Sequence, residues 1–198
     1  MGNKKYKFSR YAMYKRIQEF FDEYELPVGR CLLVGDTLRG HGGEIGNTTL
    51  TEMLPKGCKI SAPSYPDVDM QNMPYEDNTF DYVLADMVIE HVQKPWVGVE
   101  ESRRVLKVGG IAIFTSALLH PIHGIPNDYW RFTPDGLKIL CENFSEVYQC
   151  EGMGDLKLVI DCLSGRAGKQ VVPGTEIEKR ALAKDGKNMS QVWIIVGK

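Results

Sequence analysis

The sequence lacks the features that direct a chain to a membrane or to nucleic acid. No run approaches the roughly 18 consecutive apolar residues of a membrane-spanning helix, and the basic start MGNKKYKFSR is not followed by an apolar signal core. The formal net charge is only -2, so no basic excess marks a surface for nucleic acid or an anionic membrane. We therefore expect a cytoplasmic protein with a small-molecule partner, and neither nucleic acid nor a membrane as a partner.

The sequence also lacks a C-x-x-C motif and internal repeats. The five cysteines are odd in number and no two form a C-x-x-C pair, the spacing that many metal and redox sites use. We expect reduced and mostly buried thiols. The sequence also contains no internal repeat, linker or low-complexity tract, so a length of 198 residues predicts one domain.

The stretch from Met73 to Gly110 is the most informative part of the chain. It reads MPYEDNTFDYVLADMVIEHVQKPWVGVEESRRVLKVGG. Residues 80–85 form a near-continuous apolar run, which is typical of a strand buried on both faces of a parallel sheet. Pro95 suits the first turn of a helix, and Gly109 followed by Gly110 predicts its end.

This stretch resembles part of a known family. Its M-P-Y-x-D-N-x-F-D opening, the E-H after the strand and the R-V-L-K-x-G-G ending are similar to the third to fifth strands of class I S-adenosylmethionine-dependent methyltransferases that act on small molecules. The segment HGIPNDYWRFTPDGL, residues 123–137, resembles a bacterial subgroup often met near sugar and cell-surface biosynthesis. The resemblance implies transfer of a methyl group to an oxygen or nitrogen of a small acceptor.

The rest of the pattern agrees with the fold that the resemblance implies. Strand-like and helix-like segments follow one another along the rest of the chain. The helix-like segments are 9–24, 134–144 and 156–163, and the strand-like segments are 30–35, 58–62, 111–115, 144–150 and 192–196. We expect a doubly wound, mostly parallel seven-stranded α/β sheet with helices on both faces; the resemblance makes the last strand antiparallel. Residues 1–28 would form the N-terminal helix, 29–115 the cofactor-binding half, and 116–198 the substrate loop and C-terminal strands.

Residues for S-adenosylmethionine are expected where the first and fourth strands end. Open α/β sheets bind ligands at the carboxyl ends of their strands, where a glycine turn lets backbone N-H groups approach the ligand. The resemblance places Asp69 at the adenine amino group, the Met70 backbone beside a ring nitrogen and Asp86 near the methionine part. The predicted cofactor-binding residues are Gly35, Asp36, Thr37, Gly40, Asp69, Met70 and Asp86.

The first loop departs from the family pattern, which leaves two alternatives. Leu33 stands where the family has an acidic residue, and Thr37 and Arg39 replace two of its closely spaced glycines. One alternative is a methyltransferase-like module that binds a partner without catalysis. The other, suggested by GHGGEIG, is a nicotinamide-dependent oxidoreductase, although no carboxylate directly follows the strand CKISA, where such a site needs one.

A loop at 116–133 is expected to hold the acceptor, because loops above a rigid sheet carry many binding residues. An aromatic pair beside an arginine offers a stacking face and a donor fork, which suits a sugar or an anionic group. The predicted substrate-binding residues are His91, Asp128, Tyr129, Trp130 and Arg131.

Histidine is the predicted base, because its ordinary pKa suits proton removal near neutral pH. His123 is the first candidate, oriented by Asp128, and His120 is the second. His120 and His123 also have the spacing of a metal-binding pair, but no third ligand has supporting spacing, so the sequence predicts no metal.

Overall fold

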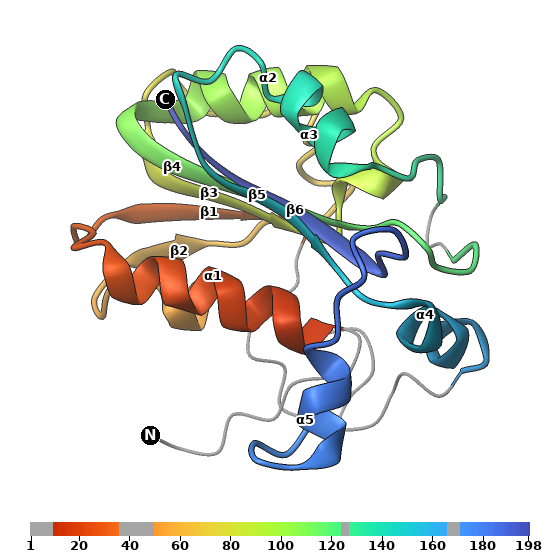
Figure 1. The fold of residues 1–198 in the computed structure, drawn as a ribbon. Coiled ribbons are helices and arrows are strands. Elements are labelled where there is room, and N and C mark those ends of the chain that lie inside the picture. The colour runs from red at the N-terminus through yellow and green to blue at the C-terminus, as the bar shows by residue number, and fades with distance from the viewer. Residues whose placement is uncertain (1–9, 36–49, 124–126, 166–170) are drawn as a thin grey trace.

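A computed structural model describes residues 10–35, 50–123, 127–165 and 171–198. Six strands form a single sheet in the order β2-β1-β3-β4-β6-β5 (Figure 1). Their bounds are Arg30–Val34 (β1), Lys59–Ser61 (β2), Phe80–Asp86 (β3), Leu106–Ala117 (β4), Glu146–Met153 (β5) and Gln191–Gly197 (β6). Strands β1 to β4 pair in parallel, whereas β6 is antiparallel to both of its neighbours, β4 and β5. The doubly wound sheet and its antiparallel last strand agree with the prediction.

The predicted number of strands was wrong, since the described part of the chain has six and not seven. The segment between β2 and β3, where the third strand was expected, forms turns and one isolated bridge between Asp69 and Asn72. Pro63, Pro66 and Pro74 interrupt it. Proline has no N-H to donate to a strand ladder, so a segment with three prolines does not form a regular strand.

Helices cover both faces of the sheet. They are α1 (Tyr11–Glu23), α2 (Pro95–Val105), α3 (Pro134–Leu140), α4 (Leu156–Leu163) and α5 (Glu176–Ala181), with short 3-10 turns η2 (Leu50–Met53) and η3 (Ile89–His91). Helices α2 and α3 lie on one face and α1 lies on the other, while α4 and α5 lie toward the end of the sheet where β3 and β4 finish (Figure 1). None of the described helices is long and apolar enough to cross a membrane.

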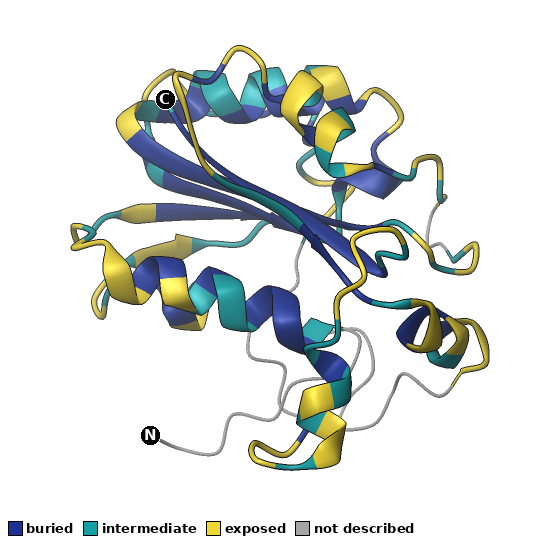
Figure 2. Ribbon diagram, in the orientation of Figure 1, coloured by how far each residue is buried: buried dark blue, intermediate teal, exposed yellow. Residues whose placement is uncertain are grey.

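Alternate side chains of the inner strands pack into two hydrophobic cores, one on each face of the sheet. Leu32 and Val83 belong to the core beneath α2 and α3, whereas Cys31 and Leu84 belong to the core against α1. This alternation is the period-two geometry of a strand. Because both faces are covered, β3 and β6 are buried almost throughout (Figure 2), which explains the continuous apolar runs in their sequences.

The predicted end of the helix that begins at Pro95 was wrong. Helix α2 ends at Val105, and Gly109 and Gly110 lie inside β4 instead of closing the helix. Leu106 already pairs with Phe80 of β3, so tertiary pairing ends the helix before the glycines.

The cysteines are mostly buried, as expected from the sequence. All five are free, and Cys31, Cys141 and Cys162 are buried. Burial raises the pKa of these three thiols above the ordinary value, so they stay protonated and behave as small apolar side chains.

Candidate functional site

The carboxyl end of β3 holds a buried acidic residue that reaches α1. Asp86 ends the strand, is 3% exposed, and accepts hydrogen bonds from the Tyr14 hydroxyl at 2.5 Å and the Thr115 hydroxyl at 2.6 Å. Arg10 donates to the Tyr14 oxygen at 3.4 Å. Burial raises the pKa of Tyr14 well above its ordinary value and the Asp86 charge adds to the shift, so Tyr14 remains a hydrogen-bond donor. The start of α1 is thereby fixed to the end of the sheet where a ligand is expected.

The turn after β1 requires glycine. Gly35 has a φ of 84°, and a Cβ atom there would lie 2.7 Å from the side chain of Val88. This backbone approaches the loop after β3 closely, as expected beside a bound ligand at the point where the strand order reverses. The predicted residues Asp36, Thr37 and Gly40 lie outside the described residues. Leu33 is fully buried in the core against α1.

Asp69, the residue predicted to contact adenine, already accepts hydrogen bonds within its own turn. The Asp69 carboxylate accepts the Gln71 backbone N-H at 2.8 Å and its side-chain amide at 3.2 Å. Gln71 in turn accepts the Lys94 backbone N-H at 3.0 Å, just before α2. The Met70 side chain is buried in the core, so only the backbone of Met70 remains for the predicted contact.

A further acidic residue lies directly after β3 and was given no role on the basis of the sequence. Glu90 in η3 is fully buried, and its Oε2 accepts the Ser116 hydroxyl at 3.1 Å. Its Oε1 has no hydrogen-bond partner among the described residues. Burial raises the pKa of Glu90. The signal that marks this residue in the sequence is an acid placed at the ligand end of a buried strand.

The loop after β4 is fixed onto η3. The backbone N-H groups of Tyr129 and Trp130 both donate to the Glu90 carbonyl, at 2.8 and 3.2 Å. The His91 Nδ1 lies 2.5 Å from the Asn127 carbonyl oxygen. Residues that were predicted separately on the two loops, His91 on one and Tyr129 and Trp130 on the other, are therefore neighbours.

Asp128 and Arg131 form the internal support of this loop. Arg131 donates to both carboxylate oxygens of Asp128, and its Nη2 also donates to the Pro121 carbonyl at 3.1 Å. These hydrogen bonds hold the pKa of Asp128 well below its usual range, so the carboxylate stays ionised. Asp128 Oδ2 accepts the His123 backbone N-H at 2.8 Å and lies 3.1 Å from the His123 Nδ1. The guanidinium predicted to bind substrate is thus already used to shape the loop.

Three histidines come together beside this support. The His123 ring centroid lies 5.0 Å from that of His91 and 4.7 Å from that of His120. Burial lowers the pKa of His123, and His120 and His91 add to the shift against the opposing charge of Asp128. His123 is therefore neutral near pH 7, the form that can accept a proton or bind a metal ion.

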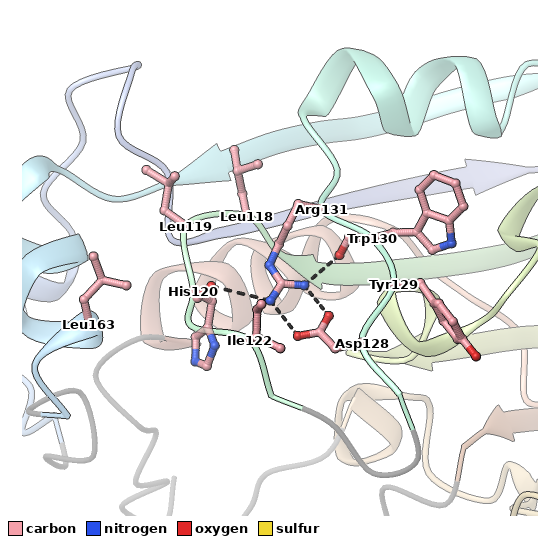
Figure 3. Close-up of a pocket in the computed structure, with 9 residues that line it drawn as sticks. All are labelled: Leu118, Leu119, His120, Ile122, Asp128, Tyr129, Trp130, Arg131 and Leu163. Carbon is pink, nitrogen blue, oxygen red and sulfur yellow. Dashed lines mark hydrogen bonds and ion pairs between the residues drawn. The ribbon is translucent and has the colours of Figure 1, made fainter.

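A cavity of about 390 Å³ opens along the same loop. Its lining combines apolar side chains with five residues that the sequence predicted for the site. The lining residues are Leu118, Leu119, His120, Ile122, Asp128, Tyr129, Trp130, Arg131 and Leu163. Figure 3 shows Arg131 between Asp128 and the backbone of His120, with the Tyr129 and Trp130 rings farther along the loop. The volume suits a small molecule. His91 and His123 are not part of this lining.

The sequence and structure comparisons both find similarity to methyltransferases. Residues 44–114 match the family model described as a methyltransferase domain. A Thermotoga maritima structure described as an S-adenosylmethionine-dependent methyltransferase and possible histamine N-methyltransferase superposes with a TM-score of 0.51 at 19% identity, over 96% of this chain and 91% of that chain. The fold is that of class I methyltransferases, and the resemblance of the central sequence block to that family is confirmed.

Two curated relatives each match less than half of the chain. A chloroplastic 2-methyl-6-phytyl-1,4-hydroquinone methyltransferase of rice is 31% identical over 93 residues, which is 46% of this chain. A sterol 4-C-methyltransferase of Caenorhabditis elegans is 37% identical over 79 residues, or 39% of this chain. The matches cover 26% and 22% of those enzymes, so the chain spans about a quarter of the length of these relatives.

Proposed function

We propose that the protein transfers a methyl group from S-adenosylmethionine to an oxygen or nitrogen of a small acceptor. The observation that carries this proposal is the methyltransferase-domain match over residues 44–114, lying on a doubly wound sheet with β6 inserted antiparallel. The Gly35 turn follows the end of β1, and Asp86 ends β3. Both therefore lie at the carboxyl ends of the strands, where such sheets bind ligands.

The described residues fit this cofactor. Gly35 brings backbone close to the ligand position without a side chain, and Asp86 keeps acceptor capacity because two of its roughly four lone-pair sites are used by hydroxyls. We assign Asp86 to the ammonium, Asp69 to the adenine amino group and the Met70 backbone to the adenine ring. Asp36, Thr37 and Gly40 belong to the same proposed site.

When bound, S-adenosylmethionine supplies an electrophilic methyl group on a sulfonium. The chain then has to align the acceptor and exclude water, because the reaction is an in-line displacement. Tyr14 and Arg10 fix α1 over the end of β3, which limits the access of water from that side. For a hydroxyl acceptor, His123 would remove the proton, with Asp128 orienting the ring, and His120 is the second candidate.

The acceptor site is assigned to the loop after β4. Tyr129 and Trp130 are 46% and 36% exposed, so their rings remain available for stacking on a ligand. Arg131 and Asp128 brace this loop internally, and His91 contributes from the η3 side. A sugar, or a precursor of a cell-surface or secondary metabolite, fits a site that combines aromatic faces with polar groups.

Calorimetric titration of the purified protein with S-adenosylmethionine, and separately with NAD, tests the proposal. Saturable binding of S-adenosylmethionine alone is the expected result. Binding of NAD alone would instead identify an oxidoreductase. Binding of neither would favour a module without catalytic activity, the alternative that the buried Leu33 supports because the family has an acidic residue there.

A further inference from the structure

Three potential metal ligands converge between η3 and the loop after β4. One ligand atom from each of Glu90, His91 and His123 lies within 4.8 Å of the other two. The spacing of the histidines along the sequence does not reveal this group, because the third ligand comes from a different loop. The hydrogen bonds from Tyr129 and Trp130 to the Glu90 carbonyl hold the two loops together.

Both histidines are oriented as metal-binding histidines are. The Nδ1 atom of His91 faces the Asn127 carbonyl at 2.5 Å, and that of His123 faces the Asp128 carboxylate at 3.1 Å and the Pro121 carbonyl at 3.2 Å. These oxygens only accept hydrogen bonds, so Nδ1 carries the proton in each ring and Nε2 keeps a free lone pair. A carbonyl or carboxylate on the other nitrogen is the usual way in which proteins orient a metal-binding histidine.

The Glu90 carboxylate gives independent support for a cation. The residue is fully buried, and Oε1 has no hydrogen-bond partner among the described residues while Oε2 accepts from Ser116. A buried carboxylate oxygen without a partner costs free energy, and a bound cation removes that cost.

We propose that Glu90, His91 and His123 bind one divalent transition metal ion, with zinc as the first candidate. Two imidazoles and one carboxylate are the ligands of catalytic zinc sites, which keep a fourth position open. Magnesium and calcium are disfavoured because they prefer oxygen ligands. Tetrahedral zinc would bring the ligand atoms to roughly 3.3 Å apart, which the half-exposed histidines can reach by side-chain rotation toward the fixed Glu90.

Metal binding would change the division of roles among the histidines. The open position would take an oxygen of the acceptor, a consequence that rests on the proposed function. A His123 nitrogen that binds the metal cannot also accept the proton of the acceptor. His120, whose ring lies 4.7 Å from that of His123, is then the candidate base.

The test is direct metal binding by the whole chain. Protein stripped with EDTA is titrated with Zn²⁺, the bound metal is counted by mass spectrometry, and thermal unfolding is followed with and without Zn²⁺. We expect one equivalent of zinc and a higher melting temperature. The substitutions His123→Asn and Glu90→Gln should each weaken zinc binding at least tenfold and abolish the shift in melting temperature. Cys58→Ser, which changes a half-buried thiol in another part of the fold, should bind zinc as the parent does.

Several outcomes would overturn the assignment. They are no zinc binding by the parent protein, unchanged affinity in both ligand variants, or tight binding of Mg²⁺ without Zn²⁺. His123 lies in a surface loop, so His123→Asn remains informative if Glu90→Gln fails to fold. Titration of the stripped protein with S-adenosylmethionine separates the two proposals, because cofactor binding that persists without metal leaves the proposed function intact when the metal site fails.

Discussion

The aspartates at the two ends of β3 have different hydrogen-bond partners. At the start of the strand, Asp81 accepts the Arg30 backbone N-H at 2.8 Å and the Lys107 ammonium at 2.9 Å. At the end of the same strand, Asp86 accepts hydrogen bonds from the hydroxyls of Tyr14 and Thr115 and from no cation in the described part of the chain. The first carboxylate is paired with a cation, whereas the second is buried and keeps the capacity to bind one.

The acidic residues around the two aspartates differ in the same way, since those near Asp81 are paired with a cation and the one near Asp86 is not. Near Asp81, Arg104 is paired with both Glu101 and Asp77. Near Asp86, Glu90 keeps one oxygen without a partner among the described residues. Within the described part of the chain, Asp77 and Asp81, just before and at the start of β3, are in ion pairs, whereas Asp86 and Glu90 at and just after its end are in none.

The largest expected effect concerns His123. If it is the base, His123→Asn should lower kcat by roughly a hundredfold or more while the affinity for S-adenosylmethionine stays unchanged. The measurement is turnover against pH with a true acceptor. A variant that keeps kcat and only raises KM would move His123 from catalysis to substrate binding.

The adenine assignment is tested at Asp69. Loss of one charge-assisted hydrogen bond in Asp69→Ala should cost about 1.5 to 3 kcal/mol of binding free energy for S-adenosylmethionine. Calorimetry measures it, and the unfolding midpoint serves as the control because Asp69 also holds the Gln71 turn. Parental affinity in this variant would show that the adenine binds elsewhere.

Exchanging the two aspartates of β3 for asparagine tests the contrast itself. Asp86→Asn should weaken S-adenosylmethionine binding about tenfold, since a neutral amide attracts an ammonium less than a carboxylate does. Asp81→Asn should leave that affinity unchanged. Equal losses in the two variants would mean that the effect is a general one on the stability of the sheet.

The smallest expected effect is a pH-dependent loss of stability. Burial raises the pKa of Asp81, but the Arg30 N-H and Lys107 outweigh it and hold the pKa below the ordinary value. A lowered pKa in the folded state gives stability above the unfolded pKa, about 3.9, that is lost as the pH falls through the folded value. Asp81→Asn should therefore cost about 1 kcal/mol of unfolding free energy at pH 7. Urea denaturation should show this difference shrinking toward pH 2.

The local sequence pattern was sufficient for the strands that are buried on both faces and for one amphipathic helix. The apolar run at 80–85 and the segment at 192–196 lie in β3 and β6, and the helix-like segment at 156–163 is α4. The end of α2 was mispredicted, because pairing of Leu106 with Phe80 outweighs the signal of Gly109 and Gly110. Local glycine chemistry does not reveal a partner strand.

The site was harder to predict because its contacts join distant segments. The hydrogen bond between Tyr14 and Asp86 links α1 to β3, and no spacing in either segment indicates it. The meeting of His91 with His123 follows only from the adjacency of β3 and β4, whose carboxyl ends carry the two loops. The open oxygen of Glu90 depends on burial, which residue identity does not report.

The position of β6 has a consequence for synthesis on the ribosome. Strand β6 is the last described element in the chain, yet it lies between β4 and β5 and pairs with both. Strand β5 cannot join the sheet until Gly197 has emerged, and until then β4 and β5 each have an unpaired edge toward the missing strand. Such edges are prone to aggregate. We expect nascent chains that stop short of β6 to depend on chaperones until β6 emerges and joins β4 to β5.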